Sequence, residues 1–159
     1  MPLPAMPAET KPRHFAFLLC PQFSLIAFTA AIEPLRLANR LALRTLYPWE
    51  ILSENGRPVA SSNGTVVQAD RALGDLPRGT HVMVCAGLDL PAAESRPVIT
   101  WLRKQARLGA TTVGICTGAH VLARAGLLDG KRATIHWENQ PAFSEEFPEV
   151  DLSNLLYCV

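Results

Sequence analysis

The residues best suited to chemistry lie where a predicted strand turns directly into a predicted helix. Residues 111–120 read Thr-Thr-Val-Gly-Ile-Cys-Thr-Gly-Ala-His, and the apolar run ends at Cys116. A turn this tight holds the cysteine side chain at the carboxyl end of the strand, and the N–H groups of the next residues open the helix beside it. The helix dipole favours a thiolate there, and free amides can hold an oxyanion or a carboxylate. The alternative is an inert cysteine buried on a core strand.

The elements that must position this cysteine follow from hydropathy patterns. Short, nearly continuous apolar runs predict parallel strands covered on both faces, at residues 14–20, 81–85, 111–116 and 155–159, with a further strand at 49–52. Apolar residues at helical spacing predict helices over 25–42, 95–109, 118–125 and 137–147. Pro34 is expected to kink or split the first helix, because proline removes a hydrogen-bond donor. A turn signal at residues 61–64 suggests an irregular β excursion.

This alternation of strands and helices predicts the architecture. It favours a three-layer α/β sandwich with a mostly parallel sheet. In such sheets, ligands bind at the carboxyl ends of the strands. The Cys116 turn is expected at that edge.

Size and charge limit what the chain can do by itself. Its 159 residues suit a single domain, and 15 Lys and Arg residues against 14 Asp and Glu residues leave no strong field to attract nucleic acid or an anionic membrane. A basic stripe of Arg103, Lys104 and Arg107 is interpreted as a solvated helix face. Proline-rich residues 1–13 are expected to form a disordered tail, and no apolar run approaches the roughly 18 residues of a membrane-spanning helix. We therefore expect a cytoplasmic protein with no membrane partner.

The cysteine pattern bears on metals and cofactors. The chain has four widely spaced cysteines: Cys20, Cys85, Cys116 and Cys158. None forms the close pair typical of a zinc site or a redox motif. We expect reduced thiols in a core, with no metal and no cofactor.

Three stretches carry a family resemblance. They are residues 28–39, which read Phe-Thr-Ala-Ala-Ile-Glu-Pro-Leu-Arg-Leu-Ala-Asn, residues 115–128 and residues 129–138. The last two combine Cys-Thr-Gly-Ala with Gly-Leu-Leu-Asp-Gly and Ala-Thr-Ile-His-Trp. From about residue 14 to its end, the chain resembles the class I glutamine amidotransferase-like superfamily that includes the PfpI peptidases. Within that superfamily it is similar to the amino-terminal sensor domain of AraC-family transcriptional regulators of the GlxA type. The resemblance implies a flavodoxin-like fold.

The resemblance also implies a function. Residues 14–159 would form a ligand-sensing and dimerising domain, incomplete at its carboxyl-terminal end, where relatives continue with another strand and a helix. DNA would be bound only through a carboxyl-terminal helix-turn-helix domain that this chain lacks. The effector would be a small nitrogenous metabolite, such as an amino acid or a quaternary amine. Its pocket would be formed by Gly87, Leu88, Cys116, Thr117, Gly118, His136 and Trp137.

An enzyme of the same superfamily is the alternative, similar to the isonitrile hydratases. Cys116 would then be the nucleophile, His136 would lie close to it, and the backbone at Gly87 would complete an oxyanion site with the amides that follow the cysteine. Two departures weigh against catalysis. Relatives that do chemistry usually carry an acid where this chain has Ala27, and often a second glycine where it has Ala86, whose methyl group would narrow the pocket floor. A third possibility is a domain that only dimerises.

Other residues that could do chemistry are given structural interpretations. Glu33 lies near the missing acid, but its polar stripe with Arg36 favours a surface ion pair. His120 is interpreted as a structural or partly exposed histidine. Trp101 and Trp137 are expected to pack on the sheet, with Trp137 as an alternative pocket wall.

Overall fold

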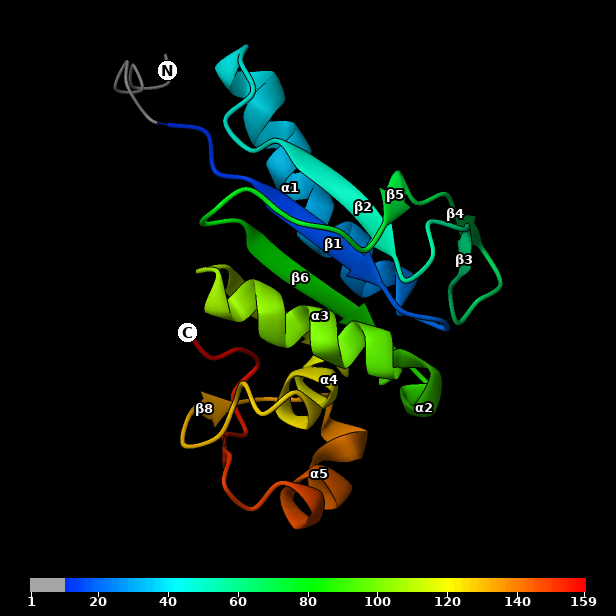
Figure 1. The fold of residues 1–159 in the computed structure, drawn as a ribbon, viewed down its shortest axis with the longest axis vertical. Coiled ribbons are helices and arrows are strands. Elements are labelled where there is room, and N and C mark those ends of the chain that lie inside the picture. Colours follow the sequence, from blue (N-terminus) through cyan, green and yellow to red (C-terminus); the bar gives the residue numbers. More distant parts are fainter. Residues whose placement is uncertain (1–10) are drawn as a thin grey trace.

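Five parallel strands form the centre of the computed structural model, which describes residues 11–159 (Figure 1). Their order across the sheet is β5-β2-β1-β6-β7, and each neighbouring pair is parallel. Their bounds are Phe15–Leu19 for β1, Trp49–Ser53 for β2, Arg71–Ala72 for β5, His81–Ala86 for β6 and Thr111–Cys116 for β7. Residues 1–10 of the tail expected over residues 1–13 lie outside the described residues. Residues 11–13 form no helix or strand.

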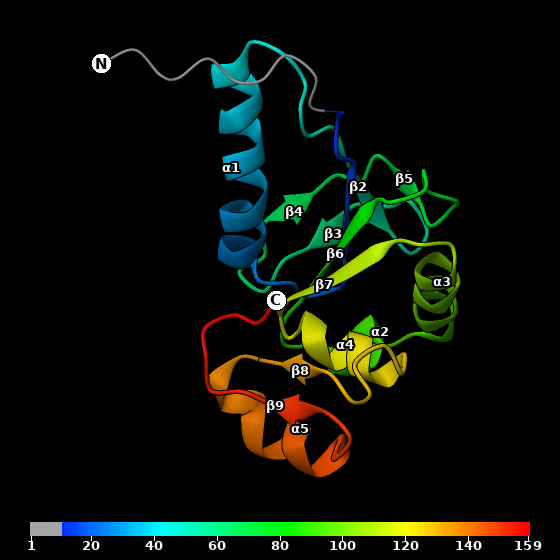
Figure 2. The same ribbon diagram turned by 90° about the vertical axis from the view of Figure 1, so that its left-hand side faces the viewer.

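Helices cover both faces of this sheet. Helix α1 (Leu25–Ala42) lies on one face, and α2 (Leu90–Ala93), α3 (Arg96–Arg107) and α4 (Gly118–Arg124) lie toward the other (Figure 2). Alternate residues of β1 point to opposite faces, so that Leu18 belongs to the core cluster with Leu102 of α3, and Phe17 to the cluster with Phe28 of α1. The three-layer α/β sandwich with a parallel sheet is confirmed.

Helix α1 is continuous despite its internal proline. Its first turn is capped by Ser24, whose Oγ accepts a hydrogen bond from the Ala27 N–H at 3.4 Å. Pro34 lies in the middle of the 18-residue helix and is exposed. Of the two outcomes expected at Pro34, a kink or a split, the split does not occur, because the apolar residues on both sides of it, among them Phe28 and Leu35, pack against the sheet.

The chain from residue 132 onward adds a small subsidiary unit. It consists of β8 (Arg132–Ala133), the 3₁₀ turn η1 (Trp137–Asn139), α5 (Gln140–Glu146) and β9 (Asp151–Leu152), and β8 pairs with β9 in parallel. Phe143 is fully buried at the centre of its core. The strand expected at residues 155–159 is wrong: these residues form no strand, and Leu156 is 99% exposed. An apolar run becomes a strand only where a neighbouring strand can pair with it.

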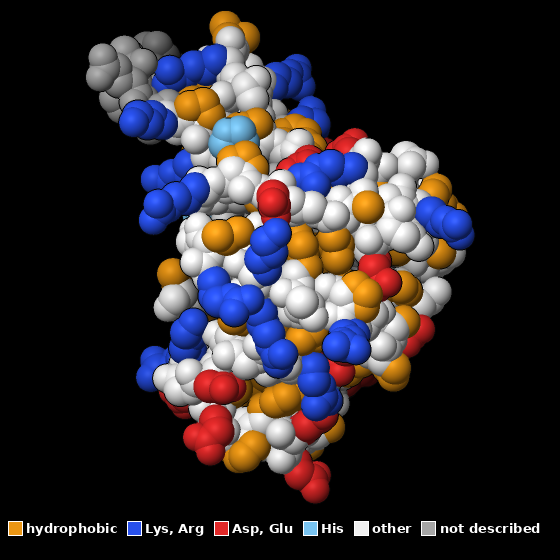
Figure 3. Space-filling model, in the orientation of Figure 1, with side chains coloured by type: hydrophobic (Ala, Val, Ile, Leu, Met, Phe, Trp, Pro, Cys, Tyr) orange, Lys and Arg blue, Asp and Glu red, His pale blue; other side chains and the backbone are white. Residues whose placement is uncertain are grey.

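A short hairpin and a basic helix face lie outside the central sheet. A short hairpin of β3 (Val59–Ala60) and β4 (Val66–Val67) encloses the turn at residues 61–64, which confirms the β excursion. Lys and Arg side chains gather on the face that carries α3 (Figure 3). Lys104 pairs there with Asp75 at 2.5 Å, and the Arg103 Nε donates to the Ala125 carbonyl at 2.9 Å. Within residues 11–159, no helix is both long enough and apolar enough to cross a membrane.

Candidate functional site

The predicted strand-turn-helix elbow is present between β7 and α4. Cys116 ends β7 with φ at +58°, a left-handed conformation that costs energy for any residue other than glycine. A Cβ atom at Gly118 would lie 2.0 Å from the Val84 carbonyl oxygen, and one at Gly114 would lie 2.4 Å from the Ala119 nitrogen. Since only hydrogen fits at these positions, α4 packs directly on the backbone of β6 and β7. The close packing holds Cys116 at the carboxyl edge of the sheet.

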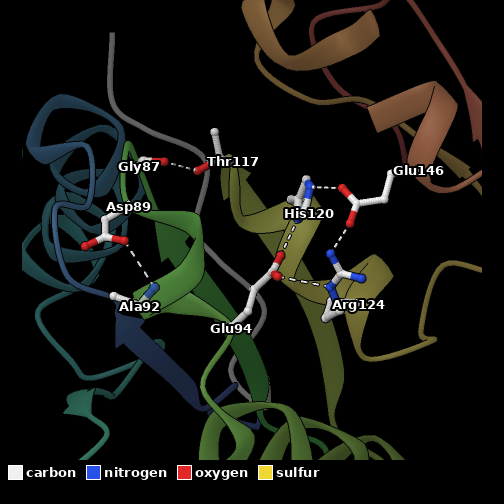
Figure 4. A network of polar contacts seen from close by, with 8 residues as sticks. All are labelled: Gly87, Asp89, Ala92, Glu94, Thr117, His120, Arg124 and Glu146. Atoms are coloured by element: carbon white, nitrogen blue, oxygen red, sulfur yellow. Dashed lines mark hydrogen bonds and ion pairs between the residues drawn. The ribbon is translucent and has the colours of Figure 1, made fainter. Parts of the chain in front are cut away.

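The thiol of Cys116 is half-buried. Desolvation raises its pKa above the ordinary value, and a hydrogen bond from the Thr117 backbone N–H offsets part of this shift. The thiol is therefore protonated at neutral pH and is a weak nucleophile, since the thiolate is the reactive form. The Thr117 hydroxyl donates to the Gly87 carbonyl at 2.8 Å, which ties the elbow to the end of β6 (Figure 4).

A cavity of about 230 Å³ opens beside this thiol, and we call it the Cys116 cavity. Five of the seven residues predicted for the pocket line it: Gly87, Leu88, Cys116, Thr117 and His136. The other two do not. Gly118 is buried against β6, and Trp137 is 70% exposed, so that the packing of Trp137 on the sheet was also predicted wrongly.

Four polar residues of the Cys116 cavity were missed by sequence reasoning: Ser24, Ser62, Glu138 and Asn139. Glu138 carries the one carboxylate of the lining, and its Oε2 lies 3.7 Å from the His136 Nδ1. The segment of Glu138 and Asn139 directly follows the His136-Trp137 pair, so its position in the sequence was a usable signal. Ser62 had no such signal, because it reaches the cavity from the distant β3–β4 hairpin.

The close approach of two backbone segments shapes one wall of this cavity. A Cβ atom at Gly87 would lie 1.9 Å from the Gln22 carbonyl oxygen, which also accepts the Leu88 N–H at 3.2 Å. Glycine is therefore required at position 87. The neighbouring Ala86 is 1% exposed and belongs to the core, so the expectation that its methyl group narrows the pocket floor was wrong.

His120 lies behind the elbow in a network of charged side chains (Figure 4). It is 6% exposed, its Nδ1 contacts a Glu94 carboxylate oxygen, and its Nε2 lies 2.9 Å from the Glu146 Oε2. The Arg124 Nε donates to the Glu94 Oε2 at 3.0 Å, and the Arg124 Nη2 contacts Glu146. The network connects α2, α4 and α5, so the structural interpretation of this histidine is confirmed.

Two further sequence interpretations are also confirmed. Glu33 pairs with Arg36 at 2.6 Å on the exposed face of α1, and hydrogen bonding to Arg36 lowers the pKa of Glu33. Trp101 is 8% exposed, packs in the core, and donates from its Nε1 to the Gly74 carbonyl at 2.8 Å. Among residues 11–159, no group of three or more His, Cys, Asp and Glu side chains is arranged to hold a metal ion.

Comparisons with known proteins place this geometry in a family. The family model described as DJ-1/PfpI family matches residues 14–149. The chain is 48% identical to the HTH-type transcriptional regulator CdhR of Pseudomonas aeruginosa, over 91% of the chain and 43% of that protein. It is 40% identical to the HTH-type transcriptional regulator GbdR of the same species, over 98% of the chain and 43% of that protein.

A solved structure agrees with these matches. The crystal structure of an AraC family transcriptional regulator from Pseudomonas putida superposes with a TM-score of 0.80 at 29% identity, covering 93% of this chain and 80% of that one. The chain spans less than half the length of CdhR and GbdR. It belongs to the DJ-1/PfpI family and is closely related to the amino-terminal domains of AraC-family regulators.

Proposed function

We propose that residues 14–159 form a ligand-sensing and dimerising domain of an AraC-type transcriptional regulator, with the effector bound non-covalently in the Cys116 cavity. One observation carries this proposal: a polar cavity opens at the carboxyl edge of the sheet beside a thiol that burial keeps protonated. Such a cavity is suited to binding rather than to nucleophilic chemistry. In the proposal, DNA is bound by the part of the regulator that corresponds to the unmatched length of CdhR and GbdR.

The lining of the cavity supports a small nitrogenous effector. Glu138 supplies a negative charge for an ammonium group, and Asn139, Ser24 and Ser62 can donate hydrogen bonds to a carboxylate. The exposed Trp137 ring does not line the cavity, but its centroid lies 5.8 Å from that of His136, which does. An aromatic ring beside a lining residue favours amines, including quaternary amines.

Thermal unfolding of the wild-type chain and of Cys116→Ala tests this proposal. A panel of amino acids, betaines, amines, aldehydes and isonitriles is added, and a ligand at about a hundred times its dissociation constant stabilises the folded state by roughly 2.7 kcal/mol. We expect an amino acid or a quaternary amine to stabilise both proteins equally, because binding does not need the thiol. Glu138→Gln should weaken binding about tenfold, whereas the exposed Glu145→Gln, outside the cavity, should not.

Two outcomes would reject the sensor proposal. Consumption of an isonitrile or aldehyde by the wild type, but not by Cys116→Ala, would assign a cysteine-dependent hydratase or hydrolase. Self-association without stabilisation by any member of the panel would leave a domain that only dimerises.

A further inference from the structure

A second cavity, of about 380 Å³, lies at the carboxyl ends of β1 and β2. We call it the Glu54 cavity, after an acid on its rim. Figure 1 places the β3–β4 hairpin beyond the tips of these two strands. The Glu54 cavity shares no lining residue with the Cys116 cavity, and the fully buried Phe23 separates Gln22, which lines the former, from Ser24, which lines the latter. Its position is one at which parallel α/β sheets bind ligands.

The buried part of the Glu54 cavity is aliphatic. Leu18, Leu19, Val59 and Val98 contribute to its lining, and none of the four is more than 8% exposed. They come from β1, β3 and α3, which are separate parts of the chain. Apolar surface of this kind binds an aliphatic group by removing it from water.

Side chains of opposite charge stand on the rim of the same cavity. Glu54 and Arg57 are both exposed and both come from the loop between β2 and β3. The Ser95 hydroxyl donates a hydrogen bond to one carboxylate oxygen of Glu54. No hydrogen bond or ion pair within residues 11–159 engages the Arg57 guanidinium. The rim therefore presents one negative group, held in place, and one cation that is available to a ligand.

The loop that carries these charges is internally braced. The buried Ser53 hydroxyl donates to the Arg57 carbonyl at 2.8 Å, and the Arg57 N–H donates to the Asn55 Oδ1 at 3.0 Å. Asn55 also forms a β-bridge with Ala72 of the edge strand β5. These bonds fix the loop backbone, which reduces the entropy that a ligand must overcome, and they leave the Arg57 side chain free to pair with it.

The thiol of Cys20, which also lines the cavity, is not reactive. Burial, together with the nearby charge of Glu54, raises the pKa of Cys20 to about 12. A thiol that stays protonated contributes a small apolar contact and does not attack a ligand. The Glu54 cavity is therefore suited to reversible binding.

We propose that the Glu54 cavity is a second small-molecule site, which takes a zwitterion with an aliphatic body, such as a branched-chain amino acid. Its carboxylate pairs with Arg57, its ammonium group pairs with Glu54, and its aliphatic part lies against Leu18, Val59 and Val98. The rim carries one positive and one negative group above an apolar interior. A zwitterion can pair with both groups, whereas a simple anion would also face the negative Glu54 and a simple cation would also face the positive Arg57. The site is separate from the proposed effector site and does not depend on it.

Isothermal titration of the 159-residue chain with L-leucine tests the proposal. We expect saturable binding, at least tenfold weaker binding of 4-methylpentanoate, which lacks the ammonium group, and an equal weakening for 3-methylbutylamine, which lacks the carboxylate. Arg57→Gln and Glu54→Gln should each weaken leucine binding about tenfold. Arg40→Gln, which removes an exposed arginine on α1, should leave it unchanged.

Two further variants identify the cavity that is occupied. Ala92→Leu enlarges a lining residue on α2 and should abolish leucine binding with little change in melting temperature. The double variant Cys116→Ala/His136→Ala alters only the other cavity and should bind leucine normally. The proposal is overturned if the wild type does not bind leucine at millimolar concentration, or if the double variant loses binding while Arg57→Gln retains it. Neither result changes the test of the effector site, which uses Glu138.

Discussion

Cys116 combines a prominent position with an environment that raises the pKa of its thiol. The elbow holds it at the carboxyl edge of the sheet in a left-handed conformation, as a nucleophile would require. Its local environment, however, disfavours the reactive thiolate form. Desolvation of the half-buried side chain raises the pKa of the thiol, and the hydrogen bond from Thr117 recovers only part of the shift. No acid lies at position 27 to accept its proton, and the carboxylate of the cavity belongs to Glu138.

Alkylation kinetics test this state of Cys116. Because its pKa is raised above the ordinary 9.0, the rate of reaction with iodoacetamide should be low at neutral pH and should rise with pH through a midpoint above 9.0. Mass spectrometry of the labelled peptides measures the rate at each cysteine. Cys20 and Cys85, both buried, should react more slowly still and serve as internal references. A midpoint below neutral pH at Cys116 would instead reveal a thiolate and favour the enzyme.

At the scale of elements, the site depends on how closely α4 approaches the sheet. Gly114 and Gly118 leave no room for a side chain between the helix and the strands, and the neighbouring residues Ala119, Val121 and Leu122 are all buried. Backbone contact therefore sets the direction in which the elbow presents Cys116 and Thr117. At the opposite wall, Gly87 lets the end of β6 contact the turn that precedes α1.

Gly118→Ala tests this packing. The added methyl group would meet the Val84 carbonyl, which is backbone and cannot move aside, so α4 must shift. We expect a loss of about 3 kcal/mol in the free energy of unfolding, measured by chemical denaturation. Gly74→Ala is the matched control, because its methyl group would meet only the end of the Arg71 side chain and no backbone atom. Equal stabilities for the two variants would show that α4 does not rest on the backbone of β6.

At the scale of the whole molecule, the charged network around His120 joins the subsidiary carboxyl-terminal unit to the main sandwich. Glu94 belongs to the turn after α2, His120 and Arg124 to α4, and Glu146 to α5. The aromatic rings of Phe143 and Phe147 pack against His120, with centroids 5.9 and 4.9 Å from it. Apolar burial and ion pairing therefore act together at this junction.

The junction should weaken in acid. Desolvation by itself raises the pKa of Glu146, but hydrogen bonds and charges from Arg124 and His120 outweigh it, so that the pKa lies below the ordinary 4.5. A carboxylate with a lowered folded-state pKa stabilises the fold above its ordinary value, and this contribution is lost as the pH falls through the lowered pKa. Glu146→Gln should therefore cost stability at pH 7, by about 1 kcal/mol or less because the side chain is 38% exposed.

Melting temperatures of the wild type and Glu146→Gln between pH 7 and pH 3 measure this effect. The difference between the two proteins should shrink below pH 4.5 as the wild-type carboxyl group is protonated. Glu145→Gln, one residue away and exposed, should match the wild type throughout. A difference that stays constant across the whole range would mean that the Glu146 side chain contributes by packing rather than by charge.

The sequence alone determined most of the sandwich, because its signals are local. Apolar runs at β1, β6 and β7 can be buried only in a covered parallel sheet, and the small residues after Cys116 specify a tight turn into a helix. Composition did not show which of the expected features would be absent from the structure. Residues 155–159 look like a strand but have no neighbouring strand to pair with, and Pro34 looks like a helix breaker but lies in a helix held by its packing.

Only the tertiary structure decided which residues share a cavity. Ser62 joins Cys116 from a distant hairpin, and Glu138 lines the cavity while its neighbour Trp137 does not. The Glu54 cavity is assembled from β1, the β2–β3 loop and the α2–α3 region, with no motif at any of them. Hydropathy and spacing describe neighbours along the chain. Cavities depend instead on packing between segments that are far apart in the sequence, and that packing is specified only when the whole core forms.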